Sequence, residues 1–228
     1  MNKMDQRSSG PHAKLILVFL LILNILNMVD RTLIVSFGTS IISDLSLSDS
    51  QFGLLTGPVF VFFYSIMGLF MGALADRVHR PKLIAAGLVL WSVLTALSGV
   101  AKSFLQIGVA RLFIGVGESV MAPSAISIIA DLFPKAKRGT ATGIYYLGVP
   151  LGAGGSFIVA GILGPMIGWR NCFFVLGATG LVLALGLLFL KDPKRGAMEE
   201  QAATAKEEGQ VDLMTGNWRR VVSEVIST

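Results

Sequence analysis

Charged side chains are scarce in this sequence, and cysteine is almost absent. Asp, Glu, Lys and Arg make up 14% of the 228 residues and hydrophobic residues make up 53%, whereas a soluble domain has roughly 25% charged residues. The mean hydropathy is +0.71. The single cysteine, Cys172, excludes an intramolecular disulfide and a thiolate-rich metal site. The composition therefore excludes an ordinary soluble domain and indicates a polytopic membrane protein.

The motifs of common enzyme classes are also missing. The sequence has no glycine-rich phosphate loop, nucleophile elbow, Cys/His metal cluster or HExxH pattern. His12 and His79 stand in polar segments without a partner at metal-ligand spacing, which is typical of surface histidines. We therefore expect no enzyme activity, no catalytic residue, no cofactor and no metal. Membrane topology explains the net charge of +5, so no nucleic-acid partner is expected either.

Long apolar runs dominate the rest of the chain. About 20 apolar residues cross a bilayer as a helix, and the runs that approach this length are 14–42, 51–75, 83–101, 105–132, 140–163 and 171–190. They predict an all-α bundle of six transmembrane helices over residues 14–190, after a short cytoplasmic tail at 1–13. A cytoplasmic linker is predicted at 191–228. Its last part, 211–228, has the spacing of a short amphipathic helix on the membrane surface.

The distribution of basic residues predicts the orientation of these spans. Fifteen of the 19 Lys and Arg residues fall in the two termini and in the even-numbered connections between spans. Because basic residues accumulate on the cytoplasmic side of a membrane protein, both termini are predicted to be cytoplasmic.

Four charged residues lie well inside the predicted spans, away from their ends: Asp30 and Arg31 in the first, and Arg111 and Glu118 in the fourth. An ionisable group at membrane depth costs roughly 2.5–3.5 kcal/mol on insertion scales and usually faces a bundle interior or a wet cavity. Arg111 and Glu118 are two helical turns apart and share a face. Pairing of these charges would offset their desolvation. We interpret the set as a transport pathway in which the carboxylates bind protons; the alternative is a permanent salt-bridge network that fixes helix register.

The turn after the second span, residues 72–82, carries a second polar pattern. Asp76 and Arg77 follow the small residue Gly72 by one helical turn, which favours switchable contacts at a helix end. Charged turns also simply orient helices, and the residues alone leave both interpretations open. The aromatic residues of the second span, among them Phe60 and Tyr64, are interpreted as helix packing.

This turn resembles the signature of major facilitator superfamily transporters, a glycine followed by D-R and then G-R-R/K. His79 departs from it, because the family usually has glycine there. R-L-F-I-G-V-G-E at 111–118 is similar to the R-x-x-x-G-x-G-E motif of the family, and 148–155 and 168–170 are similar to its motifs in and after the fifth span. Segments 27–31, 115–118, 130–134 and 144–150 look most like the Spinster-like branch.

The resemblance implies two inverted three-helix repeats, equivalent to the N-terminal half of a twelve-helix transporter whose C-terminal six-helix half is missing here. It implies that Asp30 and Glu118 bind protons, and that Arg31 and Arg111 are their partners or anchor an anionic head group. It also implies a cytoplasmic gate at Gly72, Asp76, Arg77, Arg80 and Asp131.

The expected function is proton-coupled secondary active transport by alternating access, in a bacterial inner membrane. The substrate would be an amphiphilic, lipid-like or anionic small molecule, such as a sphingolipid or lysophospholipid. One alternative is the anion:cation symporter branch, which shares the D-R pair and the G-x-G-E motif and carries small organic anions. Another is a self-assembling or non-transporting half-protein, and the sequence also has the form of a fragment.

Overall fold

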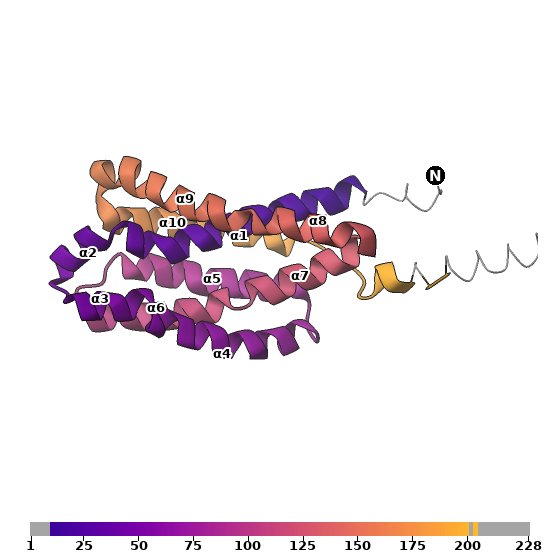
Figure 1. The fold of residues 1–228 in the computed structure, drawn as a ribbon, viewed down its shortest axis with the longest axis horizontal. Coiled ribbons are helices and arrows are strands. Elements are labelled where there is room, and N and C mark those ends of the chain that lie inside the picture. The colour runs from indigo at the N-terminus through magenta and orange to yellow at the C-terminus, as the bar shows by residue number, and fades with distance from the viewer. Residues whose placement is uncertain (1–9, 201–202, 205–228) are drawn as a thin grey trace, which may run out of the picture.

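The computed structural model describes residues 10–200 and 203–204, and this part of the chain contains helices and no strand. The predicted amphipathic helix at 211–228 lies outside the described residues. The elements, shown in Figure 1, are α1 (Pro11–Ser36), α2 (Gly38–Leu45), α3 (Asp49–Thr56), α4 (Pro58–Ala75), α5 (Arg80–Ser98), α6 (Phe104–Glu118), α7 (Met121–Leu132), α8 (Lys135–Tyr146), α9 (Gly148–Ile158), the π-helix η2 (Val159–Leu163) and α10 (Gly164–Leu188).

The helices form a bundle with one long axis. Five stretches among the described residues are long and apolar enough to cross a membrane, and the last of them, Lys135–Leu188, has 54 residues. At about 1.5 Å per residue, this stretch is more than twice as long as the ~30 Å hydrocarbon core. It is broken at Gly168, whose φ of 77° favours glycine, and the chain turns back between α9 and α10 (Figure 1). The six predicted spans therefore correspond to α1–α2, α3–α4, α5, α6–α7, α8–η2 and α10.

Local capping residues account for several helix boundaries. Ser48 accepts a hydrogen bond from the backbone N–H of Gln51, and the Gln51 side chain accepts one from the N–H of Ser48, so a capping box begins α3. Pro81 lies in the first turn of α5, where proline is favoured. The first helix begins at Pro11 rather than at Lys14, so the tail before it is shorter than predicted.

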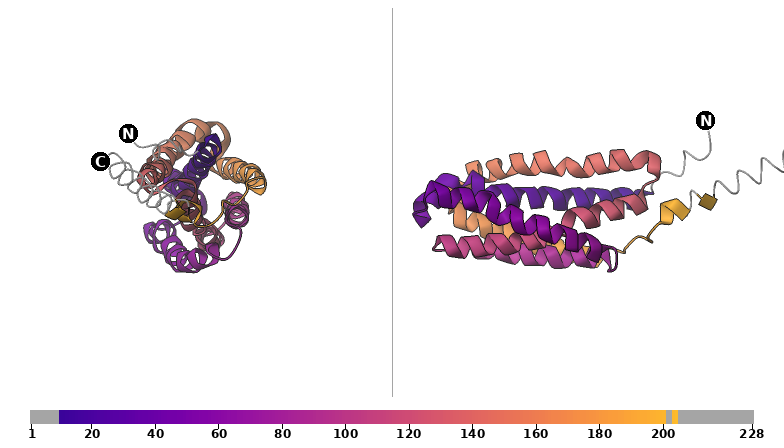
Figure 2. Two further views of the ribbon diagram at one scale, coloured as in Figure 1. Left: turned by 90° about the vertical axis from the view of Figure 1, so that its right-hand side faces the viewer. Right: turned by 60° about the horizontal axis from the view of Figure 1, so that its bottom comes forward.

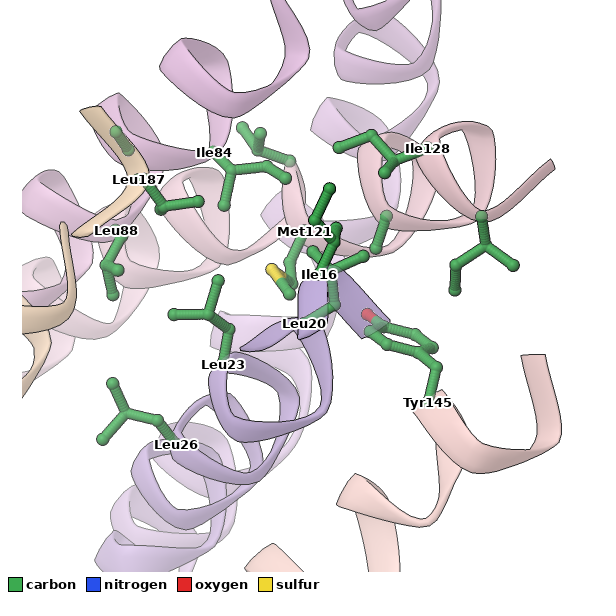
Figure 3. Packing of buried hydrophobic residues seen from close by; sticks show 14 of the residues in the cluster. Ile16, Leu20, Leu23, Leu26, Ile84, Leu88, Met121, Ile128, Tyr145 and Leu187 are labelled. Carbon is green, nitrogen blue, oxygen red and sulfur yellow. The ribbon is translucent and has the colours of Figure 1, made fainter. Parts of the chain in front are cut away.

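Two hydrophobic clusters lie at different levels of the bundle. The larger one, drawn in Figure 3, joins α1 to α5, α7, α8 and α10 and includes Ile16, Leu20, Leu23, Leu26, Ile84, Leu88, Met121, Ile128, Tyr145 and Leu187. The second cluster begins at Leu33 and includes Trp169 and Phe173 of α10. On α1 the first cluster ends at Leu26 and the second begins at Leu33. The charged residues Asp30 and Arg31 therefore lie between two apolar layers.

Glycines allow the closest helix crossings. A Cβ added at Gly152 of α9 would lie 2.5 Å from the carbonyl oxygen of Ile25 in α1. A Cβ at Gly117 of α6 would lie 2.9 Å from the carbonyl oxygen of Gly87 in α5. The left view of Figure 2, which looks along the bundle, shows the helices grouped side by side. Not every glycine has this role: added Cβ atoms at Gly53 and Gly68 would meet nothing within 4 Å in the described residues.

Replacing Gly152 with alanine is therefore expected to destabilise the bundle by about 1–3 kcal/mol, the usual cost of overpacking a core. The matched control is Gly154→Ala, two residues away on the same helix, where an added Cβ meets nothing within 4 Å. This control should be neutral or slightly stabilising, because alanine favours helix over glycine by about 0.8–1 kcal/mol. Thermal unfolding of both variants in the same detergent measures the difference. Equal stabilities would contradict the close crossing of α1 and α9.

Candidate functional site

The four intramembrane charges predicted from the sequence come together between α1 and α6. Asp30 is 3% exposed, Arg111 2% and Glu118 1%. The side chain of Arg31 is 26% exposed, whereas that of Glu118 is fully buried. Arg31 is thus the member of this set that solvent or a ligand can reach. We call these residues the charge cluster.

Arg31 and Glu118 form the ion pair of the charge cluster. The Nε and Nη2 atoms of Arg31 donate to Oε2 of Glu118 at 3.1 and 3.0 Å. Both bonds end on the same oxygen, so Oε1 of Glu118 is buried without a hydrogen-bond partner among the described residues. Arg111 shares a helix with Glu118 but donates from Nη2 to the backbone oxygen of Arg31 at 3.1 Å. The carboxylate of Glu118 is therefore paired with Arg31 of α1, one of the two arginines that the resemblance implies as partners.

Asp30 belongs to the cluster without an arginine hydrogen bond in the described structure. Its Oδ1 accepts from the hydroxyl of Thr95 in α5, and its Oδ2 is buried without a hydrogen-bond partner. The charged groups that act on it from α6 are Glu118 and Arg111, and Glu118 is close enough for a hydrogen bond when one of the two carboxyls is protonated. Two buried carboxylate oxygens without a donor are costly, because desolvation of an unpaired polar group costs about 1–3 kcal/mol. A single proton between them would satisfy both.

Aromatic rings of α4 cover the arginines. The guanidinium carbon of Arg31 lies 4.8 Å from the ring centre of Phe60 and 4.4 Å from that of Tyr64, and that of Arg111 lies 4.9 Å from Phe60. Such distances are typical of cation–π contacts. A Cβ at Gly115 of α6 would lie 3.1 Å from the backbone oxygen of Phe60, so this glycine lets α4 approach. Phe60 and Tyr64 pack in the hydrophobic core, as the sequence predicts, and, spaced one helical turn apart, they also contact the cations.

A second polar cluster lies at the end of the bundle that carries the 76–79 turn, which the sequence predicts to be cytoplasmic; we call this the inner end. The buried side chain of Arg80 donates to Asp131 and Ser127 of α7. It also donates to Asp192 at 2.8 Å and to the backbone oxygen of Pro193 at 2.7 Å. The segment after α10 is thereby attached to α5 and α7. The sequence analysis missed Asp192, although it is the first acidic residue after the last span.

The predicted gate residues do not all join this inner-end cluster. Arg80 and Asp131 are in direct contact. Asp76 and Arg77 are exposed on the turn and have no side-chain contact with the cluster in the described structure. Gly72 approaches α7 only loosely, since an added Cβ would lie 4.0 Å from Pro123. The predicted gate residues therefore fall into two groups: the ion pair of Arg80 with Asp131, and the exposed turn of Asp76 and Arg77.

The opposite, outer end of the bundle is held by Asp44. Its Oδ2 accepts from Nε1 of Trp169 at 3.0 Å and from Nε of Arg170 at 3.1 Å, and Nη2 of Arg170 also lies 3.0 Å away. The Nη1 atom of Arg170 donates to the backbone oxygens of Gly99 and Ala101 at the end of α5. This outer clamp joins α2, the α5–α6 turn and the start of the last span. Residues 168–170, which resemble a family motif, therefore have a structural role.

Comparisons with known proteins agree with this architecture. The family described as the Major Facilitator Superfamily matches residues 20–226. The chain is 30% identical to an MFS-type efflux pump of Mycolicibacterium smegmatis, covering 85% of this chain and 43% of the pump. It is 32% identical to the sphingosine-1-phosphate transporter SPNS2 of Danio rerio (80% and 37%), and 30% identical to a probable L-galactonate transporter of Escherichia coli (86% and 42%).

A solved structure of a bacterial homologue of the human lysosomal transporter Spinster, inward-facing and unoccupied, is similar in sequence and fold. It has a TM-score of 0.73 and 35% identity, covering 82% of this chain and 45% of that chain. The chain therefore spans less than half the length of these proteins. The predicted all-helical, Spinster-like architecture is confirmed.

Proposed function

Since the chain belongs to the major facilitator superfamily and is a Spinster-like, multi-pass integral membrane protein, we propose that it forms one half of a proton-coupled secondary transporter. Its spans would supply one wall of a substrate pathway, and a second six-helix half would supply the other. Rocking of the two halves would expose a site near the midplane alternately to each side. We place both termini on the cytoplasmic side, as the distribution of basic residues supports. We place the protein in a bacterial inner membrane, which the similarity to bacterial relatives supports.

The observation that carries this proposal is the charge cluster with its two unpaired carboxylate oxygens. A structural salt bridge alone would need only the Arg31–Glu118 pair. The cluster adds a buried carboxyl at Asp30, and among residues 10–200 and 203–204 no donor reaches Oδ2 of Asp30 or Oε1 of Glu118. Intramembrane carboxylates in this arrangement are typical of proton relays. We assign proton binding to Asp30 and Glu118.

Arg31 is the residue that we assign to the substrate. It is the partly exposed member of the cluster. Its guanidinium forms an ion pair with Glu118 and a cation–π contact with the ring of Tyr64. When Glu118 is protonated, its attraction for Arg31 weakens, and the arginine is released to hold an anionic group. Proton binding and anion binding would in this way favour each other, as a symporter requires. Arg111, fully buried, would support the carbonyl of Arg31 and add positive charge.

We propose an amphiphilic substrate with an anionic head group. The name of the Danio rerio relative, a sphingosine-1-phosphate transporter, supports a lipid-like substrate. A second candidate is a small organic anion, supported by the similarity to a probable L-galactonate transporter. Both candidates use Arg31 as the anchor and differ in what surrounds it.

We further propose that the exposed turn of Asp76 and Arg77 meets the second half at the inner end. Neither side chain is committed to the inner-end cluster, so both are available for contacts that form in one state of the transporter and break in the other. Gly72, Arg80 and Asp131 would form the fixed part of this gate.

A substrate panel tests the proposal. The complete transporter, meaning this chain with its second six-helix half, is reconstituted in proteoliposomes, and uptake of lysophospholipids and small sugar acids is measured with and without an imposed pH gradient. Saturable uptake of a lysophospholipid that rises with the gradient is the expected result. Saturable uptake of a sugar acid alone would favour the second candidate. Transport by this chain alone, together with a native dimer, would replace the twelve-helix proposal by a self-assembling half-transporter.

A further inference from the structure

Thr95 connects the charge cluster to α5, a helix in which the sequence analysis assigned a role only to Arg80, its first residue. Its side chain is buried, with the residue 1% exposed. Its hydroxyl donates to Oδ1 of Asp30 on α1. Asp30 thereby has one oxygen held by a neighbouring helix and one oxygen, Oδ2, without a hydrogen-bond partner in the part of the chain that the structure describes.

The direction of this hydrogen bond is unusual for a helical threonine. Hydroxyl groups inside helices commonly donate to the backbone oxygen one turn earlier, and other hydroxyls in this bundle do so: Thr32 to Met28, Ser98 to Leu94 and Thr179 to Val175. A hydroxyl has a single hydrogen to donate, and that of Thr95 goes to Asp30 of another helix. The bond therefore serves the carboxylate rather than the local helix.

The groups around Asp30 bear on which of its two carboxylate oxygens binds a proton. The charged groups that face it are Glu118 and Arg111, both from α6, and Arg31 is its neighbour on α1. The group contributed by α5 is the neutral hydroxyl of Thr95. A donor fixed on Oδ1 directs an incoming proton to Oδ2, and it stabilises the charged carboxylate against proton uptake.

We propose that Thr95 is a positioning residue for proton binding at Asp30: its hydroxyl holds Oδ1, so that the proton binds at Oδ2 and does so at a lower pH than without the hydroxyl. This inference rests on the proposed function, which places a proton on Asp30. In the step itself, a proton from water forms an O–H bond at Oδ2 and neutralises the carboxylate, and it returns to water on the other side of the membrane. The hydroxyl of Thr95 keeps its own hydrogen throughout.

The test compares variants that keep the volume of Thr95 with variants that keep its donor. In the purified full chain, the protonated carboxyl of Asp30 is identified in the infrared spectrum as the band that Asp30→Asn removes, and the pH at which half of this band appears is measured. Thr95→Val, which keeps the shape and loses the donor, should raise this midpoint by about one pH unit, the size expected for loss of one hydrogen bond to a charged group. Thr95→Ser should keep the wild-type midpoint, and Thr95→Cys, with its weak donor, should lie between them.

The outcomes separate this inference from the proposed function. If Thr95→Val keeps the wild-type midpoint while Asp30→Asn removes the band, Thr95 has only a packing role and the inference is wrong. If Thr95→Ser shifts the midpoint as much as Thr95→Val, the hydroxyl is not the cause and the inference is also wrong. If Asp30→Asn changes neither the band nor the pH dependence of uptake by the complete transporter, the proton is not on Asp30 and the proposed function itself fails there. Should Thr95→Val not fold, the Thr95→Cys midpoint decides.

Discussion

Replacing Glu118 with glutamine is expected to reduce gradient-driven uptake to about the rate measured without a pH gradient. Glutamine has nearly the shape of glutamate, and its amide oxygen can still accept from Arg31, but it cannot bind a proton. Glu118 is 1% exposed and its Oε2 accepts two hydrogen bonds from Arg31, so the substitution changes charge while it preserves packing. Uptake by the complete transporter is measured at equal pH and with an imposed gradient.

The same variant should not weaken substrate binding, although it abolishes the response to the pH gradient. With the carboxylate gone, the positive charge of Arg31 is no longer neutralised, and an anionic substrate is attracted more strongly. We therefore expect the KM for an anionic substrate to be unchanged or lower while the response to the gradient disappears. Asp49→Asn is the matched control, because it neutralises an exposed carboxylate at the start of α3. A Glu118→Gln transporter that responds to the gradient like the wild type would remove Glu118 from proton coupling.

Replacing Arg80 with glutamine is expected to lower the free energy of unfolding by about 3 kcal/mol or more. Removing one partner of a buried ion pair costs about 3–5 kcal/mol, because the remaining charge is left without compensation. Here two carboxylates lose their cation: the side chains of Asp131 and Asp192 are only 11% and 16% exposed. Denaturation of the purified chain in detergent, followed by circular dichroism, measures the change.

The chain offers an exposed ion pair as the control for this prediction. Lys194 and Glu200 lie 2.6 Å apart with side chains 73% and 64% exposed. Exposed pairs contribute about 0–1 kcal/mol, so Lys194→Gln should change stability by no more than that. Adding Asp131→Asn to Arg80→Gln should restore part of the loss, since it removes one of the unpaired carboxylates. Equal stabilities of the Arg80 and Lys194 variants would show that the inner-end cluster does not hold the bundle.

The members of the charge cluster could be predicted from the sequence, but their pairing could not. Asp30, Arg31, Arg111 and Glu118 stand out because each interrupts a long apolar run. Which arginine meets which carboxylate depends on the relative height and rotation of α1 and α6, which the packing of the whole bundle sets. Glycine contacts, such as that of Gly115 with the backbone of α4, contribute to this packing. A single sequence contains no direct signal for such registers.

Several other residues of the two clusters were harder to find. Thr95 looks like any other hydroxyl in an apolar helix, because threonine there usually bonds to its own backbone. Phe60 and Tyr64 did carry a signal, since residues four apart share a helix face, but aromatic pairs are common in packed helices. Asp192 was missed because it stands among basic residues after the last span, where a loop was expected.

The two ends of the bundle differ in how they tolerate substitution. At the inner end the side chain of Arg80 has acceptors on four residues, Ser127, Asp131, Asp192 and Pro193, so loss of any one leaves three in place. At the outer end a single oxygen, Oδ2 of Asp44, accepts from both Trp169 and Arg170. Substitutions can therefore remove acceptors at the inner end one at a time. At the outer end, a change of Asp44 removes the shared acceptor of two side chains at once, and Arg170 keeps only the backbone oxygens of Gly99 and Ala101.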